Sequence, residues 1–401
     1  MRTLLFSTLY PSASRPAHGI FVETRLRELL KTGEVETRVV APVPWWPSTA
    51  ARWGDYARMA ATPREDVRHG IAVQYPRYPV VPRFGMTVAP ALLALAARPA
   101  IQRLIDQGYD FDLIDAHYYY PDGVAAALLA RHFRKPFCIT ARGTDLNLIP
   151  QHALPRAMIR WTSRQAFASI GVCSALMDVL RDWGDVPASR LHVMRNGVDL
   201  QRFHPLPPAD CRRRLGQDGA PLLLSVGHLI ERKGHHVAID ALAQLRRHWP
   251  GARLLIVGEG GERGALLRQA QSLGVQDAVQ LVGAVPNAEL AAWYSAADVL
   301  ILASSREGWA NVLLEAMACG TPVVATDIWG TPEVVTPRSG GRLVAQRDGA
   351  AFATEIAALL DAPPERAAVR AYAEGFSWDE TSRAQLALFR QMAAAGQARS
   401  G

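Results

Sequence analysis

The sequence predicts an α/β protein built from two doubly wound parallel sheets. Short runs of β-branched and aliphatic residues alternate with helical patterns along the whole chain, which is typical of parallel strands joined by helices. The chain has 401 residues, of which 49% are hydrophobic. This length and composition suit two domains of ordinary size, each with its own core.

The expected strands form one group in each half of the chain. The first strand is followed by a predicted helix, because apolar residues from Phe21 to Leu30 recur on one face and Gly33 marks the end. The other strands are short apolar runs between turn residues. The strands expected in the first half are Thr3–Ser7, Thr37–Pro42, Ala72–Tyr75, Leu113–His117, Phe137–Thr140, Ser169–Cys173 and His192–Met194, and those in the second half are Leu222–Val226, Leu254–Val257, Val279–Leu281, Val299–Ala303, Val323–Ala325 and Arg342–Val344.

A segment without periodicity lies between the two halves. Asn196–Gly219 holds three prolines, three glycines and an arginine triplet, which indicates a linker. We therefore predict an N-terminal domain over residues 1–205 and a C-terminal domain over residues 206–375. A helix within residues 376–401 is expected to pack back toward the first domain.

The excess of positive charge is confined to the first half. The net charge of the chain is +7. Residues 1–200 hold 24 Lys and Arg against 17 Asp and Glu, whereas residues 201–401 hold 20 of each kind. This asymmetry indicates that the first half faces something acidic.

No segment is expected to span a membrane. The longest apolar runs, Val88–Ala97 and Val124–Ala130, are too short for a transmembrane helix. The N-terminal run lacks the pattern of a signal-peptide cleavage site. The cysteines are scattered without metal-type spacing, which favours a reduced, cytoplasmic compartment. They are Cys138, Cys173, Cys211 and Cys319.

Two glutamates frame one short helical pattern in the second half. We expect a strand end, a loop with Glu307, and a helix that carries Glu315 and ends before Gly320. The free amides at the start of this helix favour a phosphate group. Ionised carboxylates only accept hydrogen bonds, so both glutamates suit the hydroxyls of a sugar. The amides are those of Ala310, Asn311 and Val312.

This stretch and its continuation, Gly330–Val335, resemble the E-x7-E signature of the family 4 retaining glycosyltransferases. The resemblance implies the GT-B fold, in which two Rossmann-like domains face each other across a cleft. It also implies that Glu307 contacts hydroxyls of the transferred hexose and that Glu315 binds the ribose of the nucleotide.

The segment Leu222–Leu242 resembles the strand, loop and helix whose arginine and lysine hold the donor diphosphate in this family. Lys233 matches the lysine. His228 stands at the arginine position, where a neutral imidazole offers one donor against the five of arginine. Arg232 is near enough in sequence to compensate for that difference.

Two further turns of the second half carry partial matches to known patterns. Leu254–Leu267 is rich in glycine, but Arg263 occupies the position of the last glycine in a dinucleotide-binding fingerprint. Val279–Val299 is similar to the family segment whose backbone lies against the base. The resemblance assigns that contact to Gly283 and Val285.

Three loops of the first half also match the family. The resemblance implies that Gly19 lets the backbone approach the donor phosphate and that His117, at the end of an apolar strand, contacts the donor hexose. Arg142 and Asp145 follow the next strand and are expected on the acceptor side. Ligands of open α/β sheets bind at these carboxyl ends of strands.

In this family the leaving diphosphate is thought to take the proton of the acceptor hydroxyl, so the protein positions the substrates and stabilises charge. The sequence shows no nucleophile with a paired base. Asp110–Asp112 mimics a metal-binding DxD motif but precedes a strand, so we interpret it as a loop. Neither a metal nor a cofactor is expected, and the donor is a UDP- or GDP-sugar.

The sequence therefore predicts a retaining hexosyltransferase of cell-envelope or extracellular polysaccharide synthesis, with a saccharide or lipid-linked acceptor. No nucleic-acid partner is expected. A GT-B-fold sugar-nucleotide epimerase and a non-catalytic sugar-nucleotide binder remain alternatives. Peripheral contact with an anionic membrane, at the inner face of the plasma membrane, is expected from a basic and apolar segment. Its cations are Arg77, Arg83, Arg98 and Arg103.

Overall fold

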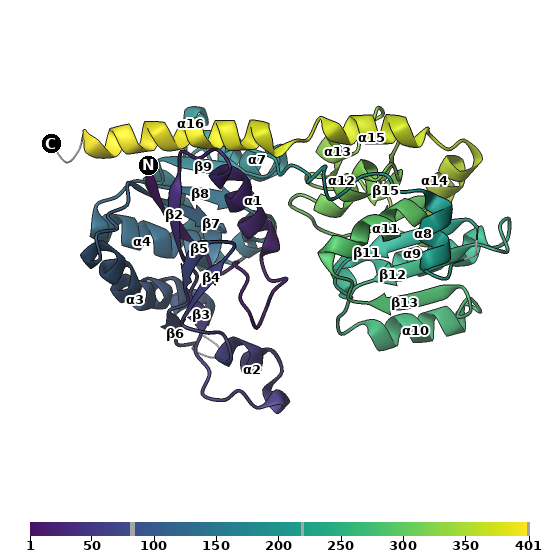
Figure 1. Cartoon of the computed structure of the whole chain (residues 1–401), viewed down its shortest axis with the longest axis horizontal. Coiled ribbons are helices and arrows are strands. Elements are labelled where there is room, and N and C mark those ends of the chain that lie inside the picture. Colours follow the sequence, from purple (N-terminus) through teal and green to yellow (C-terminus); the bar gives the residue numbers. More distant parts are fainter. Residues whose placement is uncertain (81–84, 218–219, 399–401) are drawn as a thin grey trace. The chain divides into compact units, whose positions relative to one another are not determined.

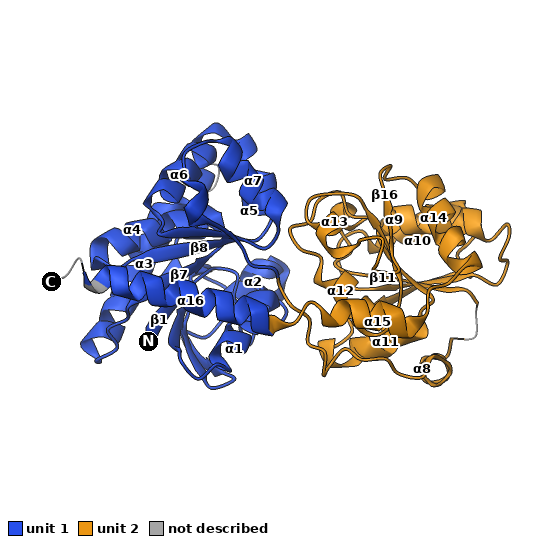
Figure 2. Cartoon of the chain, turned by 90° about the horizontal axis from the view of Figure 1, so that it is seen from above, with its two compact units in different colours: residues 1–195, 379–401 blue, residues 196–378 orange. Residues whose placement is uncertain are grey.

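Parallel strands form the centre of each of two units in this computed structural model, which describes residues 1–80, 85–217 and 220–398. Unit 1 comprises residues 1–195 together with the C-terminal segment from residue 379, and unit 2 comprises residues 196–378 (Figure 2). This is the two-sheet α/β architecture that the sequence predicts.

Unit 1 contains an eight-stranded sheet in the order β10-β9-β8-β7-β1-β2-β5-β4. Neighbouring strands are parallel except for β4 and β5, and β3 and β6 form a separate parallel pair. The strands are β1 (Arg2–Phe6), β2 (Glu36–Val40), β3 (Val43–Pro44), β4 (Glu65–Arg68), β5 (Ile71–Gln74), β6 (Arg77–Tyr78), β7 (Leu113–His117), β8 (Phe137–Ala141), β9 (Ala168–Gly171) and β10 (Leu191–Val193).

Helices cover both faces of this sheet (Figure 1). The central strands β7 and β8 are buried along their whole length, as expected for a parallel sheet between helical layers. The helices of unit 1 are α1 (Ile20–Leu30), η1 (Ala51–Trp53), α2 (Asp55–Ala60), α3 (Gly85–Asp106), η2 (Tyr119–Gly123), α4 (Val124–Phe133), α5 (Thr144–Asn147), η3 (Ile149–Gln151), α6 (Ala153–Gln165), α7 (Ser174–Asp182), η4 (Ala188–Arg190) and the C-terminal α16 (Trp378–Gln397).

The helix α16 packs on unit 1, although it follows unit 2 in the sequence (Figure 1). Its apolar side chains Leu386, Phe389 and Met392 share a core with Leu29 and Leu113. Burial of this apolar face holds the end of the chain against the first sheet.

The boundary between the units lies ten residues earlier than the sequence predicts, at 195/196 rather than 205/206. The connecting residues belong to unit 2 because their backbone is tied there. The amide of Val198 donates to the carbonyl of Phe376 at 2.9 Å, and the guanidinium of Arg370 donates to the carbonyls of Leu200 and Phe203.

Unit 2 contains a six-stranded parallel sheet in the order β13-β12-β11-β14-β15-β16. The strands are β11 (Leu222–Val226), β12 (Arg253–Val257), β13 (Val279–Gly283), β14 (Val299–Leu302), β15 (Val323–Thr326) and β16 (Arg342–Val344). The helices are α8 (Pro208–Arg214), η5 (Glu231–Lys233), α9 (His235–Leu245), α10 (Arg263–Ser272), η6 (Asn287–Glu289), α11 (Leu290–Ala296), α12 (Asn311–Ala318), α13 (Thr331–Val334), α14 (Gly349–Asp361) and α15 (Arg366–Glu374).

One helix corrects the expectation that no segment is long enough to cross a membrane. Within the described part of the chain, Met86–Asp106 of α3 reaches that length. A window of 18 residues in it has a mean hydropathy of 1.3, and 39% of that window is buried. Leu93, Ala97 and Ile101 recur at helical spacing and are fully buried, so one face of α3 belongs to the core of unit 1.

Candidate active site

The order of strands in unit 2 reverses between β11 and β14. From β11 the chain adds β12 and then β13 on one side, and it then crosses back to add β14, β15 and β16 on the other. Ligands of open α/β sheets bind beyond the carboxyl ends of the strands at such a reversal. The loops that follow β11 and β14 therefore form the candidate site of this unit.

A buried glutamate meets two cations at this reversal. Oε1 of Glu307 accepts hydrogen bonds from Nζ of Lys233 at 2.6 Å and from the hydroxyl of Ser304 at 2.7 Å. Nη1 of Arg232 lies 3.8 Å from Oε2 of the same carboxylate and donates to the carbonyl of Arg306. The structure thus brings together three residues that the sequence singles out, from loops more than seventy residues apart.

The turn before α9 places Lys233 opposite Glu307. Gly234 has a left-handed backbone (φ 72°), and a Cβ atom there would lie 1.9 Å from the carbonyl oxygen of Ala303, directly after β14. Only glycine fits such a close approach. Arg347 joins the same two loops. Its guanidinium donates hydrogen bonds to the carbonyls of Ala303 and Glu231 at 2.7 and 2.8 Å.

A buried tyrosine orients Glu315 on α12. The hydroxyl of Tyr294 donates to Oε2 of Glu315 at 2.7 Å, and the ring of Tyr294 packs edge-on against Phe203. Burial raises the pKa of Glu315, and the hydrogen bond from Tyr294 opposes that rise. Oε1 accepts no hydrogen bond from the described residues, so it is available to a ligand hydroxyl.

The start of α12 offers free backbone donors. Within the described residues, the amides of Ala310, Asn311 and Val312 donate to no protein acceptor, and no side chain caps the helix. The carboxamide oxygen of Asn311 accepts from Asn196 at 3.2 Å, which fixes that side chain. Such a helix start favours an anion.

His228 is exposed at the end of β11, and its neighbour His235 is the buried histidine of this loop. Nε2 of His235 faces the carbonyl of His228 at 3.2 Å, so it carries the proton, and Nδ1 accepts from the hydroxyl of Ser225 at 2.9 Å. Burial lowers the pKa of His235 to about 4. Sequence reasoning missed His235, although it directly precedes an apolar helical run.

Gly283 and Val285 lie at the carboxyl edge of the same sheet, where β13 ends. Gly283 has a positive φ of 93°, and its carbonyl accepts from the amide of Gly258 at 2.8 Å. The contact of these residues with a base stays a prediction from the family resemblance.

In unit 1 the strand order reverses between β1 and β7. Gly19 belongs to the loop after β1 and has a left-handed backbone (φ 66°). A Cβ atom there would lie 2.4 Å from the carbonyl carbon and oxygen of Leu9. Packing within the loop therefore requires a glycine at this position, with or without a ligand.

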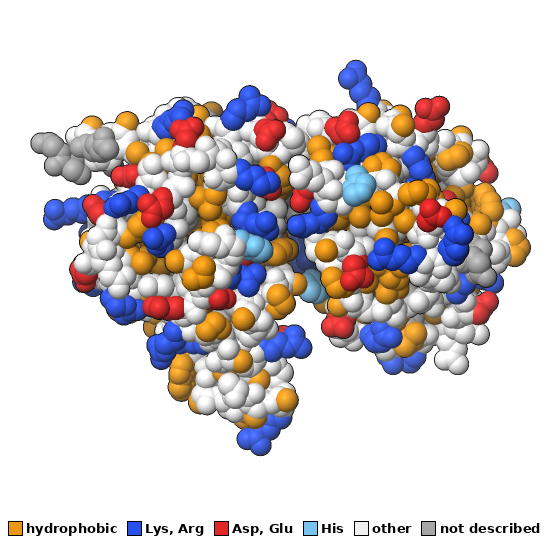
Figure 3. Space-filling view, in the orientation of Figure 1, with side chains coloured by type: hydrophobic (Ala, Val, Ile, Leu, Met, Phe, Trp, Pro, Cys, Tyr) orange, Lys and Arg blue, Asp and Glu red, His pale blue; other side chains and the backbone are white. Residues whose placement is uncertain are grey.

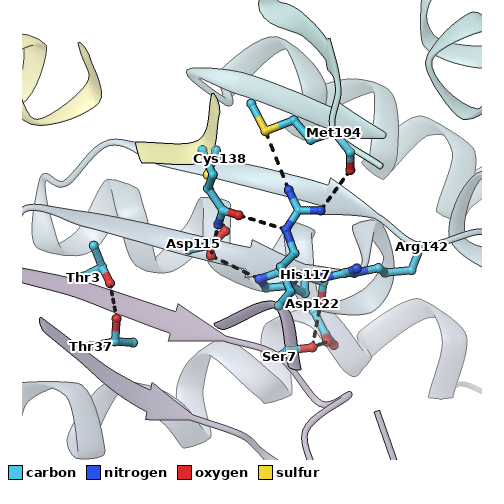
Figure 4. Close-up of polar contacts among 11 residues, drawn as sticks. Thr3, Ser7, Thr37, Asp115, His117, Asp122, Cys138, Arg142 and Met194 are labelled. Carbon is cyan, nitrogen blue, oxygen red and sulfur yellow. Dashed lines mark hydrogen bonds and ion pairs between the residues drawn. The ribbon is translucent and has the colours of Figure 1, made fainter. Parts of the chain in front are cut away.

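His117 ends β7, and both of its ring nitrogens are engaged within unit 1 (Figure 4). Nδ1 lies 2.5 Å from Nη2 of Arg142, which can only donate, so the imidazole proton is on Nε2, 3.1 Å from Asp115. Burial, opposed by Asp115 and aided by Arg142, lowers the pKa of His117 to about 4. His117 is therefore a neutral, 1% exposed link between Asp115 and Arg142.

The same network continues into the C-terminal helix. The carboxamide of Gln385 on α16 donates to Asp115 at 3.1 Å and accepts from Arg25 at 2.9 Å. Burial raises the pKa of Asp115, but His117 and Arg25 outweigh it, so the net shift is downward. Asp115 and Gln385 were not identified from the sequence.

Asp145, which the sequence predicts on the acceptor side, has a structural role in unit 1. It is fully buried, and its carboxylate accepts from the amides of Arg142, Gly143 and Tyr119 at 2.7 to 3.0 Å. These bonds join the loops after β7 and β8, and they leave Asp145 no exposed surface for an acceptor.

Two models of known protein families match this chain, one in each half. A family model described as Glycosyltransferase Family 4 matches residues 51–202, and one described as Glycosyl transferases group 1 matches residues 210–376. A D-inositol 3-phosphate glycosyltransferase of Frankia alni is 35% identical over 309 residues, which cover 71% of this chain and 75% of that protein. The chain belongs to the family 4 glycosyltransferases.

Other similar proteins differ in their names. TuaC of Bacillus subtilis, named for teichuronic acid biosynthesis, is 27% identical over 82% of both chains. A sucrose-phosphate synthase from Thermosynechococcus elongatus superposes with a TM-score of 0.77 at 23% identity, covering 98% of this chain and 99% of that one. Anabaena HepE, solved with UDP-glucose, gives 0.71 at 21% identity and covers 99% of both chains. The glycosyltransferase therefore has the GT-B fold that the resemblance implies.

In this glycosyltransferase the structure assembles part of the predicted site directly. Arg232, Lys233 and Glu307 are in contact, and His117 contacts Arg142. The residues that sequence reasoning missed are those that hold the predicted ones in place. They are Ser304, Arg347, Tyr294, His235, Asp115 and Gln385.

Proposed function

We propose that this glycosyltransferase moves a hexosyl group, with retention of configuration, from a nucleoside-diphosphate sugar to a saccharide or lipid-linked acceptor. The observation that carries the proposal is the convergence of Lys233 and Arg232 on Glu307 at the strand reversal of unit 2. Two cations suit a diphosphate, and a carboxylate suits sugar hydroxyls. The similar HepE protein was crystallised in complex with UDP-glucose, which supports this class of donor.

Each group of the site has a task in this proposal. Lys233, Arg232 and the free amides of α12 stabilise the departing diphosphate. Glu307 holds hydroxyls of the hexose, and Glu315 accepts hydrogen bonds from the ribose. The bond from the anomeric carbon to the diphosphate breaks as the acceptor oxygen attacks on the same face, and a diphosphate oxygen takes the proton of the acceptor hydroxyl.

The role in cell-envelope or extracellular polysaccharide synthesis is supported by the similarity to TuaC over 82% of both chains. A protein of this role works in the cytoplasm, at the inner face of the membrane.

The four arginines that were expected to contact a membrane differ in their surroundings. Arg77 donates to the carbonyls of Ala60 and Thr62, Arg83 lies outside the described residues, and Arg98 and Arg103 are exposed on α3.

A lobe formed by η1 and α2 is a better candidate for membrane contact. It exposes Trp53 and Tyr56, which surround Trp46, and it carries the exposed cations Arg52 and Arg58. Figure 3 shows basic and hydrophobic side chains interleaved on this part of unit 1. Aromatic and basic side chains together favour the interface of an anionic bilayer.

A panel of nucleotide sugars tests the proposed function. The purified chain is incubated with UDP- and GDP-hexoses, with and without saccharide acceptors, and the nucleoside diphosphate and the recovered sugar nucleotide are measured. Diphosphate release that rises with an acceptor supports transfer. An epimerised sugar nucleotide would identify an epimerase, and binding without turnover of any donor would identify a non-catalytic binder; either result would contradict the proposal.

A further inference from the structure

A cavity of about 930 Å³ lies at the amino ends of strands β8, β9 and β10 in unit 1. His117 and Arg142 lie at the opposite, carboxyl edge of the same sheet. The five residues of β8 separate the two edges by roughly 13 Å at 3.3 Å per residue. The cavity is therefore distinct from the site described above, and its volume is in the usual range for small-molecule sites.

Positive charge surrounds this cavity without acidic counterparts. The cations Arg131, Arg134, Lys135 and Arg190 line it together with His192, whose pKa is lowered by burial, and no Asp or Glu is among its described lining residues. Lys135 is paired with Asp110 outside the lining, whereas the guanidinium groups of the three arginines make no hydrogen bond or ion pair within the described residues. Part of the charge excess of residues 1–200 is thus gathered here and unbalanced.

Helix ends account for only part of this cluster. Arg131 and Arg134 lie at the end of α4, where cations are generally favourable. Arg190 ends the three-residue helix η4, which is too short to explain it by a helix dipole, and His192 lies in β10. Arg134 also has a left-handed backbone (φ 56°) at the helix cap, a position where glycine is preferred. An arginine adopts this left-handed backbone at a conformational cost.

Apolar groups form the rest of the lining. Phe137, Trp161 and Phe167 supply aromatic surface, and Leu388 and Ala395 of α16 supply one wall. Unpaired guanidinium groups bind phosphate oxygens in a bidentate manner, and aromatic surface favours an apolar or ring-containing body.

We propose that this cavity is a second ligand site, which binds an organic phosphate with an aromatic or apolar part. Neither the donor nor the acceptor of the transfer reaction is required to occupy it. The phosphate could come from a soluble metabolite or from a lipid headgroup, and the experiment distinguishes these sources.

The test uses isothermal titration calorimetry of the full chain with 4-methylumbelliferyl phosphate. The variant combines Arg134→Gly, which relieves the left-handed backbone and leaves the fold intact, with Arg190→Ala. We expect the dissociation constant to rise by about tenfold or more, with no loss of melting temperature. The matched control, Arg247→Ala with Arg268→Ala, removes two exposed cations from unit 2 and should bind as the wild type does.

Three results with the soluble probe would overturn the proposal. The double variant could bind the probe as tightly as the wild type, 4-methylumbelliferone without phosphate could bind equally well, or Lys233→Met alone could abolish binding, which would place the probe in the donor site. If the soluble probe fails to bind but phosphatidic acid vesicles bind with the same dependence on Arg134 and Arg190, the phosphate is that of a lipid. Failure of both probes would contradict the proposal.

Discussion

The ammonium group of Lys233 lies 2.6 Å from the carboxylate of Glu307, and the two residues come from loops on either side of the strand reversal in unit 2. The pair keeps each charge partnered before a donor arrives. Under the proposed function, the phosphates of a bound donor replace Glu307 as the partner of Lys233, and its hydroxyls replace Lys233 as donors to Glu307.

The first prediction concerns the lysine of this pair. Lys233→Met should weaken the binding of the donor's nucleoside diphosphate by about 1.5–3 kcal/mol, because a charge-assisted hydrogen bond to phosphate is lost. Calorimetric titration measures the effect, and Lys31→Met is the matched control, because Lys31 also pairs with a glutamate but is exposed on unit 1. An unchanged affinity in a folded Lys233→Met protein would remove the lysine from the phosphate site.

The second prediction separates ribose from phosphate. Glu315→Gln should weaken nucleoside diphosphate binding by about 1–3 kcal/mol, and Tyr294→Phe should weaken it less, because the carboxylate remains but loses its orienting hydrogen bond. Inorganic pyrophosphate has no ribose and should bind both variants as it binds the wild type. If Glu315→Gln weakens the binding of the nucleoside diphosphate and of pyrophosphate equally, Glu315 acts on the helix or on the phosphate.

The sequence predicts the strands that are buried and the loops that follow them. All thirteen expected strands are present, whereas β3, β4 and β6 were missed. β3 and β6 have two residues each, and β4 pairs only at the sheet edge with half of its residues exposed, so none carries a clear apolar pattern. Edge pairing of this kind depends on neighbours that are distant in sequence.

The predicted site residues are those with a motif, and the missed ones act through tertiary contacts. Lys233 and Glu307 stand in recognisable stretches, but their alignment depends on the approach of Gly234 to Ala303, which no local pattern reveals. Asp115 is an acidic residue inside an apolar strand, and its partner Gln385 lies 270 residues away on the C-terminal helix. Only the fold shows that such residues meet.

A third prediction concerns the stability of unit 1. Burial raises the pKa of Asp122 to about 7 from 3.8, against hydrogen bonds from Ser7 and Thr8. The folded state therefore holds a proton that the unfolded state releases near pH 4, so stability falls as pH rises from about 4 to 7. Each unit by which the pKa of Asp122 differs between the folded and unfolded states contributes up to about 1.4 kcal/mol to the free energy of unfolding.

Asp122→Asn removes this proton uptake. Between pH 5 and pH 7.5, the melting temperature of the wild type should fall by several degrees more than that of the variant, at roughly 2–4 °C per kcal/mol. Glu65→Gln, at an exposed acid of β4, is the control. Parallel melting curves for wild type and Asp122→Asn would show that Asp122 is ionised throughout.

A fourth prediction concerns His117. Because burial and Arg142 hold its pKa at about 4, the ring should stay neutral, with its proton on Nε2, between pH 5 and pH 8. Nitrogen-15 spectra of histidine-labelled protein measure this, with His117→Asn to assign the signal. Arg142→Met removes a neighbouring positive charge and should raise the pKa of His117. A wild-type signal that titrates near pH 6.5 would contradict the buried network.

The most direct test of the proposed donor site uses Glu307→Gln, because this change should have opposite effects on two measurements. The nucleoside diphosphate alone should bind about 3–10-fold more tightly, since Lys233 is released from its ion pair and a negative charge beside the phosphates is gone. Transfer from the intact sugar donor should fall about 100-fold, since the hexose loses its acceptor of hydrogen bonds. Diphosphate affinity by calorimetry and transfer by diphosphate release, measured on one preparation, should therefore change in opposite directions. If both fall together, or if transfer is unchanged, Glu307 is not the hexose-binding carboxylate.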